Sequence, residues 1–198
     1  MISIEEQQKL LLNVSRRLKN KIAVYAVGGT AMMFSGLKES TLDIDLVFEN
    51  EKDRDEFKKA AIALGYREMD AVKVYGIRNN APEMLKLNDE RFDLFVNEVI
   101  DFVFSENMKK RAVNMHQFED KLLLKIADPH DLILMKCATD RQKDADDAVY
   151  AVISHQKIKS RLVTGAVRIP RKVQGICYVH VLRHAFPQGL FCRISEIG

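Results

Sequence analysis

The sequence predicts an α/β (α+β) fold: a small mixed β-sheet with helices on one side, followed by a C-terminal helical segment and a basic tail of unassigned structure. Three observations support this prediction. Short apolar runs of strand length alternate along the chain with longer segments of helical periodicity. Glycines mark several boundaries between these segments. The 198 residues are 47% hydrophobic and 30% charged, which suits one globular domain or one domain with an appendage.

The first 50 residues are expected to form two helices and two strands. Residues 3–20 carry an apolar stripe with the helical period, and Ser3 is placed to cap that helix. Residues 22–27 form a short apolar run ending in two glycines, as a buried strand does. A second helix is expected over 30–34 and a second strand over 42–48.

The middle of the chain continues this alternation. A charged helix is expected over 50–64, because its apolar side chains gather on one side and Gly65 follows as a terminator. Residues 66–79 are expected to form one or two strands, and 91–96 to form another. The apolar members of the strands within 66–79 are Val72, Val74 and Ile77.

Beyond residue 100 the expected elements are a helix, a strand pair and two further helices. Their ranges are 105–114, 118–126, 130–139 and 142–153. After residue 160 prolines and glycines interrupt short apolar runs, and the sequence predicts no structure for this tail.

Composition excludes several classes of protein. No apolar run approaches the ~18 residues of a membrane span, and the N-terminus lacks the pattern of a secretory signal. Three cysteines, Cys137, Cys177 and Cys192, are too few and too scattered for a disulfide framework, which favours a cytoplasmic location. The net charge of +3 is uneven: residues 160–198 hold six basic residues and one acid. This tail is the part most suited to contact RNA.

Two carboxylates form the first candidate site. Asp43 and Asp45 lie two apart in the predicted strand 42–48, so their side chains project from the same face. Strands disfavour Asp, and two like charges side by side repel each other. A divalent cation such as Mg²⁺ removes this repulsion by taking both as oxygen ligands. The alternative is a half-exposed strand with solvated acids.

Asp93 is a third candidate ligand. It stands inside the apolar run 91–96 much as Asp45 stands inside its own strand, and a charge there is costly unless it is paired or bound to metal. If the two strands are neighbours, the three carboxylates can converge on one or two Mg²⁺ ions, as phosphoryl transfer requires. Asp93 could also take the proton of an attacking hydroxyl.

Gly28 and Gly29 precede the predicted helix 30–34. Glycine permits close approach of the backbone, and N–H groups at the start of a helix can hold phosphate oxygens. The glycines and the carboxylates together indicate chemistry on a phosphorylated substrate.

These motifs resemble the DNA polymerase β-like nucleotidyltransferases, and more narrowly the minimal group that includes the AbiE-type toxins. The resemblance covers about residues 20–155 and has three motifs in order. They are Gly28-Gly29-Thr30-Ala31 with Thr41-x-Asp43-x-Asp45, then Asp93, and then the helix pair from Leu134 to Asp147. It implies Mg²⁺- or Mn²⁺-dependent transfer of a nucleoside monophosphate from an NTP, with release of pyrophosphate.

The resemblance also implies roles for single residues. Asp43, Asp45 and Asp93 would be catalytic and metal-binding. The nucleotide would be bound by Gly28, Gly29, Thr30, Thr41, Lys136, Arg141, Lys143 and Asp144. Within the third motif, Lys136 would be a phosphate contact and Asp144 an orienting carboxylate. The alternative is a solvated helix with local Lys–Asp pairs. Relatives often have an arginine two residues before the motif threonine, where this chain has Glu39.

The resemblance implies a division into three parts. These are a catalytic core over 1–127, a helical segment over 128–159 that completes the nucleotide site, and a basic appendage over 160–198. The expected acceptor is a hydroxyl of an RNA such as tRNA, of a protein or of a small molecule, and an antitoxin is a possible partner. The alternatives are an inactive nucleotide- or protein-binding module of the same fold, and an α/β domain without a nucleotide site.

Overall fold

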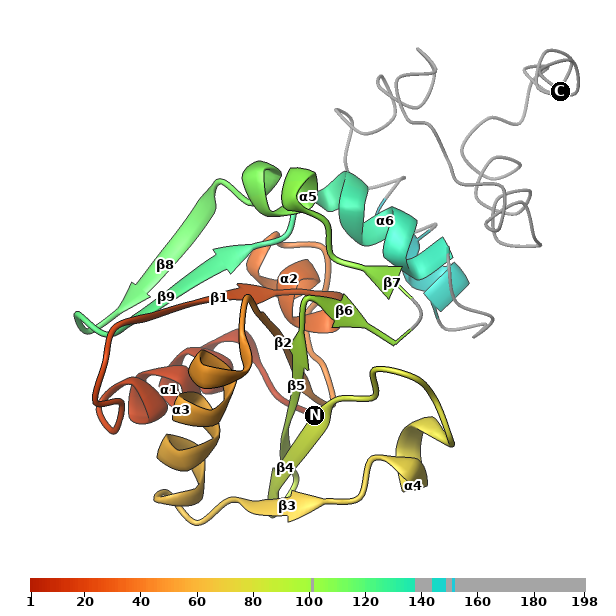
Figure 1. Cartoon of the computed structure of the whole chain (residues 1–198). Coiled ribbons are helices and arrows are strands. Elements are labelled where there is room, and N and C mark those ends of the chain that lie inside the picture. The colour runs from red at the N-terminus through yellow and green to blue at the C-terminus, as the bar shows by residue number, and fades with distance from the viewer. Residues whose placement is uncertain (101, 138–143, 149–150, 152–198) are drawn as a thin grey trace, which may run out of the picture. The chain divides into compact units, whose positions relative to one another are not determined.

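The computed structural model describes residues 1–100, 102–137, 144–148 and 151 (Figure 1). The chain divides into two compact units, Met1–Leu132 and Ile133–Gly198, and each is described by itself. The described helices are α1 (Ile4–Ser15), α2 (Gly28–Phe34), α3 (Glu51–Ile62), α4 (Val72–Tyr75), α5 (Glu106–Arg111) and α6 (Pro129–Cys137). The described strands are β1 (Ile22–Ala26), β2 (Ile44–Phe48), β3 (Arg67–Met69), β4 (Glu83–Leu87), β5 (Glu90–Val96), β6 (Glu98–Val99), β7 (Phe102–Val103), β8 (Asn114–Phe118) and β9 (Leu122–Ile126).

The first unit is built on one mixed sheet. The strand order is β3-β4-β5-β2-β1-β9-β8, with β6 and β7 attached beside β5. β2 runs parallel to β5 and β1 runs parallel to β9, whereas the other pairs are antiparallel. The predicted α/β fold with a mixed sheet is therefore confirmed.

The main core lies between one face of the sheet and the neighbouring helices α1 and α3 (Figure 1). The ring of Phe57 on α3 packs edge-on against Phe48 of β2 and Phe92 of β5, with ring centroids 5.6 Å and 5.3 Å away. Burying each such side chain contributes about 1.5–3 kcal/mol. Because side chains alternate along a strand, Asp45 and Asp93 project from the opposite face of the sheet.

The N-terminal helix begins as predicted and ends five residues early. Ser3 and Glu6 form a capping box, in which each side chain accepts the backbone N–H of the other. α1 stops at Ser15 and not at residue 20, because Glu56 of α3 accepts the N–H groups of Lys19 and Asn20 at 2.6 and 3.2 Å. The chain therefore turns after Ser15 towards β1.

The prediction of strands over 66–79 is wrong in most of its length. Only β3 is a strand, and the short helix α4 follows after the side chain of Asp70 accepts the N–H of Val72 at 3.0 Å. The three apolar residues expected inside strands, Val72, Val74 and Ile77, are exposed. Phe95 and Phe92 are three residues apart on β5, so their side chains point to opposite faces of the sheet. Because Tyr75 of α4 contacts Phe95, α4 lies on the face opposite α3. The sheet thus has helices on both faces, and the prediction of helices on one side only is wrong.

Two further differences concern element bounds. β4 follows Pro82 and was not predicted, although it joins β3 to β5 in the sheet. α5 covers only Glu106–Arg111 of the predicted 105–114, because β8 already begins at Asn114. β8 and β9 form the predicted strand pair, with β8 beginning four residues before the expected start at 118.

The segment around the unit boundary is helical as predicted. α6 covers most of the predicted range 130–139, and residues 144–148 and 151 are helical within the predicted 142–153. The tail over 160–198, with its predicted RNA contacts, lies outside the described residues. Within the described part of the chain, the helices are too short or too polar to cross a membrane.

Candidate active site

The pairing of β2 with β5 brings two of the predicted carboxylates together. Asp45 on β2 is the direct register partner of Asp93 on β5. Both follow a residue that faces α3, so both project from the other face of the sheet. The side chain of Asp93 is fully buried. The sequence prediction that these strands are neighbours is confirmed.

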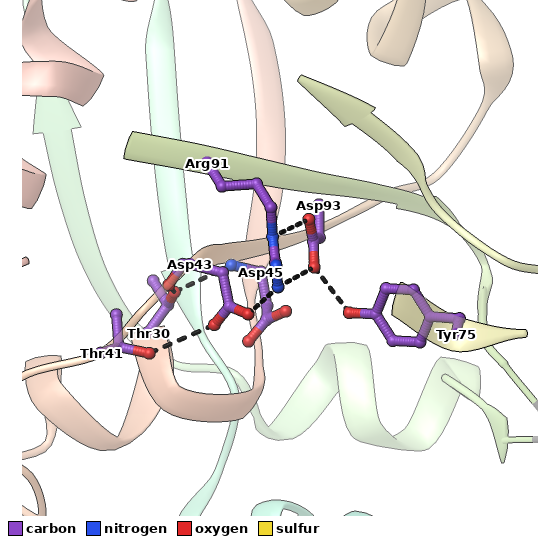
Figure 2. A network of polar contacts seen from close by, with 7 residues as sticks. All are labelled: Thr30, Thr41, Asp43, Asp45, Tyr75, Arg91 and Asp93. Atoms are coloured by element: carbon purple, nitrogen blue, oxygen red, sulfur yellow. Dashed lines mark hydrogen bonds and ion pairs between the residues drawn. The ribbon is translucent and has the colours of Figure 1, made fainter. Parts of the chain in front are cut away.

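Asp43 joins this pair from outside the strand. β2 begins at Ile44 and not at residue 42, because Thr41 exchanges backbone hydrogen bonds with Ile2 at 2.7 and 3.1 Å. Asp43 therefore lies outside the strand, and the prediction that strand alternation brings it to the same face as Asp45 is wrong. One oxygen of Asp43, one of Asp45 and one of Asp93 nevertheless lie within 4.8 Å of one another. Figure 2 shows the three carboxylates turned towards a common centre.

Two threonines fix the positions of the carboxylates. The hydroxyl of Thr30 on α2 accepts the N–H of Asp45 at 2.9 Å and donates to the carbonyl of Asp43 at 3.5 Å. The hydroxyl of Thr41 donates to the Asp43 carboxylate at 3.3 Å. Both threonines are buried. The motif threonines therefore orient the acidic residues (Figure 2).

The double glycine is required by close packing beneath the carboxylates. Gly28 has φ +53°, and a Cβ there would lie 2.3 Å from Oδ2 of Asp45. A Cβ on Gly29 would lie 2.4 Å from the hydroxyl oxygen of Thr41. α2 begins at Gly28, two residues earlier than predicted, so the glycines are its first turn. Larger residues at these positions would displace the acidic and hydroxyl groups.

Arg91 is a site residue that sequence reasoning missed. Its Nε donates to Oδ1 of Asp93 at 2.9 Å, one terminal nitrogen donates to Oδ2 at 3.0 Å, and the same nitrogen contacts Asp43. Burial lowers the pKa of Arg91, but the charges of Asp93 and Asp43 outweigh burial and the net pKa is raised. The signal was available, because Arg91 lies two residues before Asp93 on one strand and hence on the same face.

Tyr75 is the second missed residue. Its hydroxyl donates to Oδ2 of Asp93 at 2.6 Å. Burial, followed by the charges of Asp45 and Asp93, raises the pKa of Tyr75, so the phenol keeps its proton. No sequence signal pointed to this contact, because Tyr75 lies in the segment that was expected to form strands.

The electrostatics of the cluster suit a cation. Burial raises the pKa of Asp93, and the opposing effects of Arg91 and Tyr75 do not cancel this rise. Three carboxylates clustered together repel one another, which a divalent cation would offset. Oxygen ligands from carboxylates are the donors that Mg²⁺ and Mn²⁺ prefer. Asp43, Asp45 and Asp93 therefore fit a divalent metal ion.

The remaining predicted residues belong to the second unit. Lys136 is paired there with Asp144, which is buried, and its ammonium lies 3.1 Å from a carboxylate oxygen of Asp147. Burial lowers the pKa of Lys136, but Asp144 and Asp147 more than offset it, so the net pKa is raised. Asp144 thus orients Lys136. The other two predicted nucleotide ligands, Arg141 and Lys143, lie outside the described residues.

Solved structures similar to this chain include two of the antibiotic-resistance factor ANT(2'')-Ia. A crystal structure of ANT(2'')-Ia in complex with adenylyl-2''-tobramycin is 17% identical, covers 81% of this chain and 95% of that chain, and has a TM-score of 0.49. A solution structure of ANT(2'')-Ia is 16% identical, covers 81% of this chain and 90% of that chain, and also has a TM-score of 0.49. A comparison with curated protein sequences found no match.

Comparison with protein families gives a match over most of the chain. Residues 1–167 match the family described as nucleotidyltransferase of unknown function, DUF6036. The matched range contains both motif threonines, both glycines, all three carboxylates and the Lys136–Asp144 pair. The chain therefore belongs to this nucleotidyltransferase family and is an enzyme that transfers nucleoside monophosphates.

Proposed function

We propose that the protein is a Mg²⁺-dependent nucleotidyltransferase, with Mn²⁺ as a substitute, that transfers a nucleoside monophosphate from an NTP to a hydroxyl acceptor. The observation that carries this proposal is the convergence of Asp43, Asp45 and Asp93 within 4.8 Å. A structural domain without a site would gain nothing from three acids at such close range, because each would add repulsion.

All three carboxylates, Asp43, Asp45 and Asp93, would hold the metal in this proposal, and Asp93 has a second role. When bound, the ion aligns the attacking and leaving oxygens and offsets the charge of the phosphates. The acceptor oxygen forms a bond to the α-phosphorus, the bond from that phosphorus to the β-phosphate oxygen breaks, and pyrophosphate leaves. Asp93 takes the proton of the acceptor hydroxyl.

Residues proposed to contact the nucleotide occur in each unit. In the first unit, the backbone of Gly28 approaches Asp45 and that of Gly29 approaches Thr41, while Thr30 and Thr41 hold Asp45 and Asp43 in place. In the second unit, Lys136, Arg141 and Lys143 supply positive charge for phosphate oxygens, with Asp144 orienting Lys136. The proposed parts remain a core over 1–127, a helical segment over 128–159 and a basic appendage over 160–198.

The acceptor classes are RNA, including tRNA, protein, and a small molecule. The resemblance to AbiE-type toxins favours a macromolecular acceptor in the cytoplasm and an antitoxin partner, and the basic tail suits RNA by charge. An aminoglycoside is the small molecule to test first.

The test incubates the protein and Mg²⁺ with each α-labelled NTP in turn. Total RNA, cell protein and an aminoglycoside are supplied as separate acceptors. We expect label to appear on one class of acceptor, together with release of pyrophosphate. Nucleotide-induced stabilisation without pyrophosphate release would instead indicate an inactive binding module. Neither stabilisation nor labelling by any NTP would indicate a domain without a nucleotide site.

A further inference from the structure

Arg91 contacts two of the three carboxylates that would hold a metal ion. Its guanidinium donates to both oxygens of Asp93 and contacts Asp43 (Figure 2). Oδ2 of Asp93 also accepts the hydroxyl of Tyr75. A carboxylate oxygen has about two lone pairs, so Oδ2 already has both of them engaged.

The same contacts offset part of the repulsion among the three carboxylates. Three carboxylates within 4.8 Å repel one another, and Asp93 has no exposure to water. A planar guanidinium can bridge two carboxylates with separate N–H groups and thereby offsets part of this repulsion. The side chain of Arg91 is itself only 18% exposed, so these contacts are little screened by solvent.

We propose that Arg91 is a positioning residue that holds Asp43 and Asp93 together in the metal-free enzyme and leaves Asp43 when a divalent cation binds. This inference rests on the proposed metal site. Arg91 then has two opposite effects, since it stabilises the carboxylate cluster and lowers the affinity of that cluster for metal. An ion pair that served only the fold would stabilise the protein without competing with a cation.

Lys86 supplies a matched control. It is the direct register partner of Arg91 on the antiparallel strand β4, so it lies on the same face of the sheet and carries the same charge. Its side chain is exposed. Replacing Lys86 with Met removes one positive charge beside the site and leaves the guanidinium contacts in place.

The experiment measures Mn²⁺ binding to the full chain by calorimetry without nucleotide, and thermal unfolding with and without Mn²⁺. We expect Arg91→Met to bind Mn²⁺ about tenfold more tightly, the factor set by one charge-assisted hydrogen bond that no longer has to break. The metal-free variant should unfold at a lower temperature, and Mn²⁺ should raise its midpoint more than that of the wild type. Lys86→Met should match the wild type in both.

Equal or weaker Mn²⁺ binding by folded Arg91→Met would overturn the proposal. If that variant does not fold, Arg91→Lys decides the matter, because an ammonium keeps the charge but does not span both carboxylates. Arg91→Lys should then bind Mn²⁺ more tightly than the wild type, and unchanged or weaker binding would contradict the proposal. Asp43→Asn separates this inference from the proposed function. If Asp43→Asn leaves Mn²⁺ binding unchanged, the proposed metal site is wrong, and the proposed role of Arg91 is then wrong as well.

Discussion

Asp45 of β2 and Asp93 of β5 are opposite each other in a parallel strand pair, with no offset in register. This relationship places two acidic side chains on the face of the sheet opposite α3. It also makes the site depend on the alignment of two strands, since a slip of one residue would turn a carboxylate into the core beside Phe57. The groups around the pair then decide how accurately it is held.

Gly28 is expected to tolerate no side chain. In Gly28→Ala the new Cβ would lie 2.3 Å from Oδ2 of Asp45. Gly36→Ala is the control, because Gly36 also has a positive φ (+69°) but has open space where the Cβ would be. Left-handed strain alone costs roughly 1–2 kcal/mol. Gly28→Ala should lose more stability than this in chemical denaturation and should also lose Mn²⁺ binding. Equal losses in the two variants would show that the close approach to Asp45 is unimportant.

Thr30 is expected to act through its hydroxyl. Thr30→Val keeps the shape of the side chain but leaves the N–H of Asp45 without the 2.9 Å acceptor that it now has. Leaving a buried donor unsatisfied costs about 1–3 kcal/mol. Thr30→Ser retains the hydroxyl and should keep most of the stability and the transfer activity. The free energy of unfolding and the rate of pyrophosphate release test this, and similar losses in both variants would contradict a specific role of the hydroxyl.

Tyr75 is expected to matter for activity more than for stability. Tyr75→Phe removes the hydroxyl that donates to Asp93, and loss of a partner that orients a metal ligand typically costs about 10–100-fold in activity. Tyr66→Phe is the control, because Tyr66 donates a 2.7 Å hydrogen bond of the same kind to Glu90, which is outside the carboxylate cluster. Both variants should lose similar stability in thermal unfolding. Only Tyr75→Phe should lose activity, and equal activities would contradict a role for Tyr75.

Glu56 is expected to make the end of α1 sensitive to pH. The backbone N–H groups of Lys19 and Asn20 lower the pKa of Glu56. An acid with a lowered folded-state pKa contributes stability above its unfolded pKa of about 4.3, and this contribution disappears as the pH falls through the folded value. Glu56→Gln should therefore be less stable than the wild type at pH 7 and equally stable at low pH. A stability difference that does not depend on pH would contradict this account.

The carboxylate site was largely predictable from sequence, and the reasons differ among its members. Asp45 and Asp93 each interrupt an apolar run. Both runs form strands in the middle of the sheet, so the local sequence pattern predicted their positions correctly. Asp43 was found through its spacing from Asp45, although it lies outside the strand because Thr41 pairs with Ile2. Arg91 could have been found by the same alternation that placed Asp93.

Tyr75 could not have been found in this way. The residues of α4, Val-Lys-Val-Tyr, have strong strand propensity, and a hydrogen bond at Asp70 and contacts with Phe95 and Asp93 overrode it. β4 was missed because its two buried residues, Met84 and Leu85, are adjacent and give no alternation. Such contacts depend on residues distant in sequence, which a local pattern does not contain.

The central claim is that the three carboxylates hold a divalent cation for nucleotidyl transfer. Its most direct test measures pyrophosphate release from NTP with the labelled acceptor, in Mg²⁺ and in EDTA, for the wild type, Asp45→Asn and Asp89→Asn. Asp89 is an exposed acid in the turn between β4 and β5, so its variant removes the same charge outside the cluster. We expect activity only with Mg²⁺, a loss of at least about 100-fold in Asp45→Asn, and wild-type activity in Asp89→Asn. Undiminished pyrophosphate release in EDTA or in Asp45→Asn would contradict the claim.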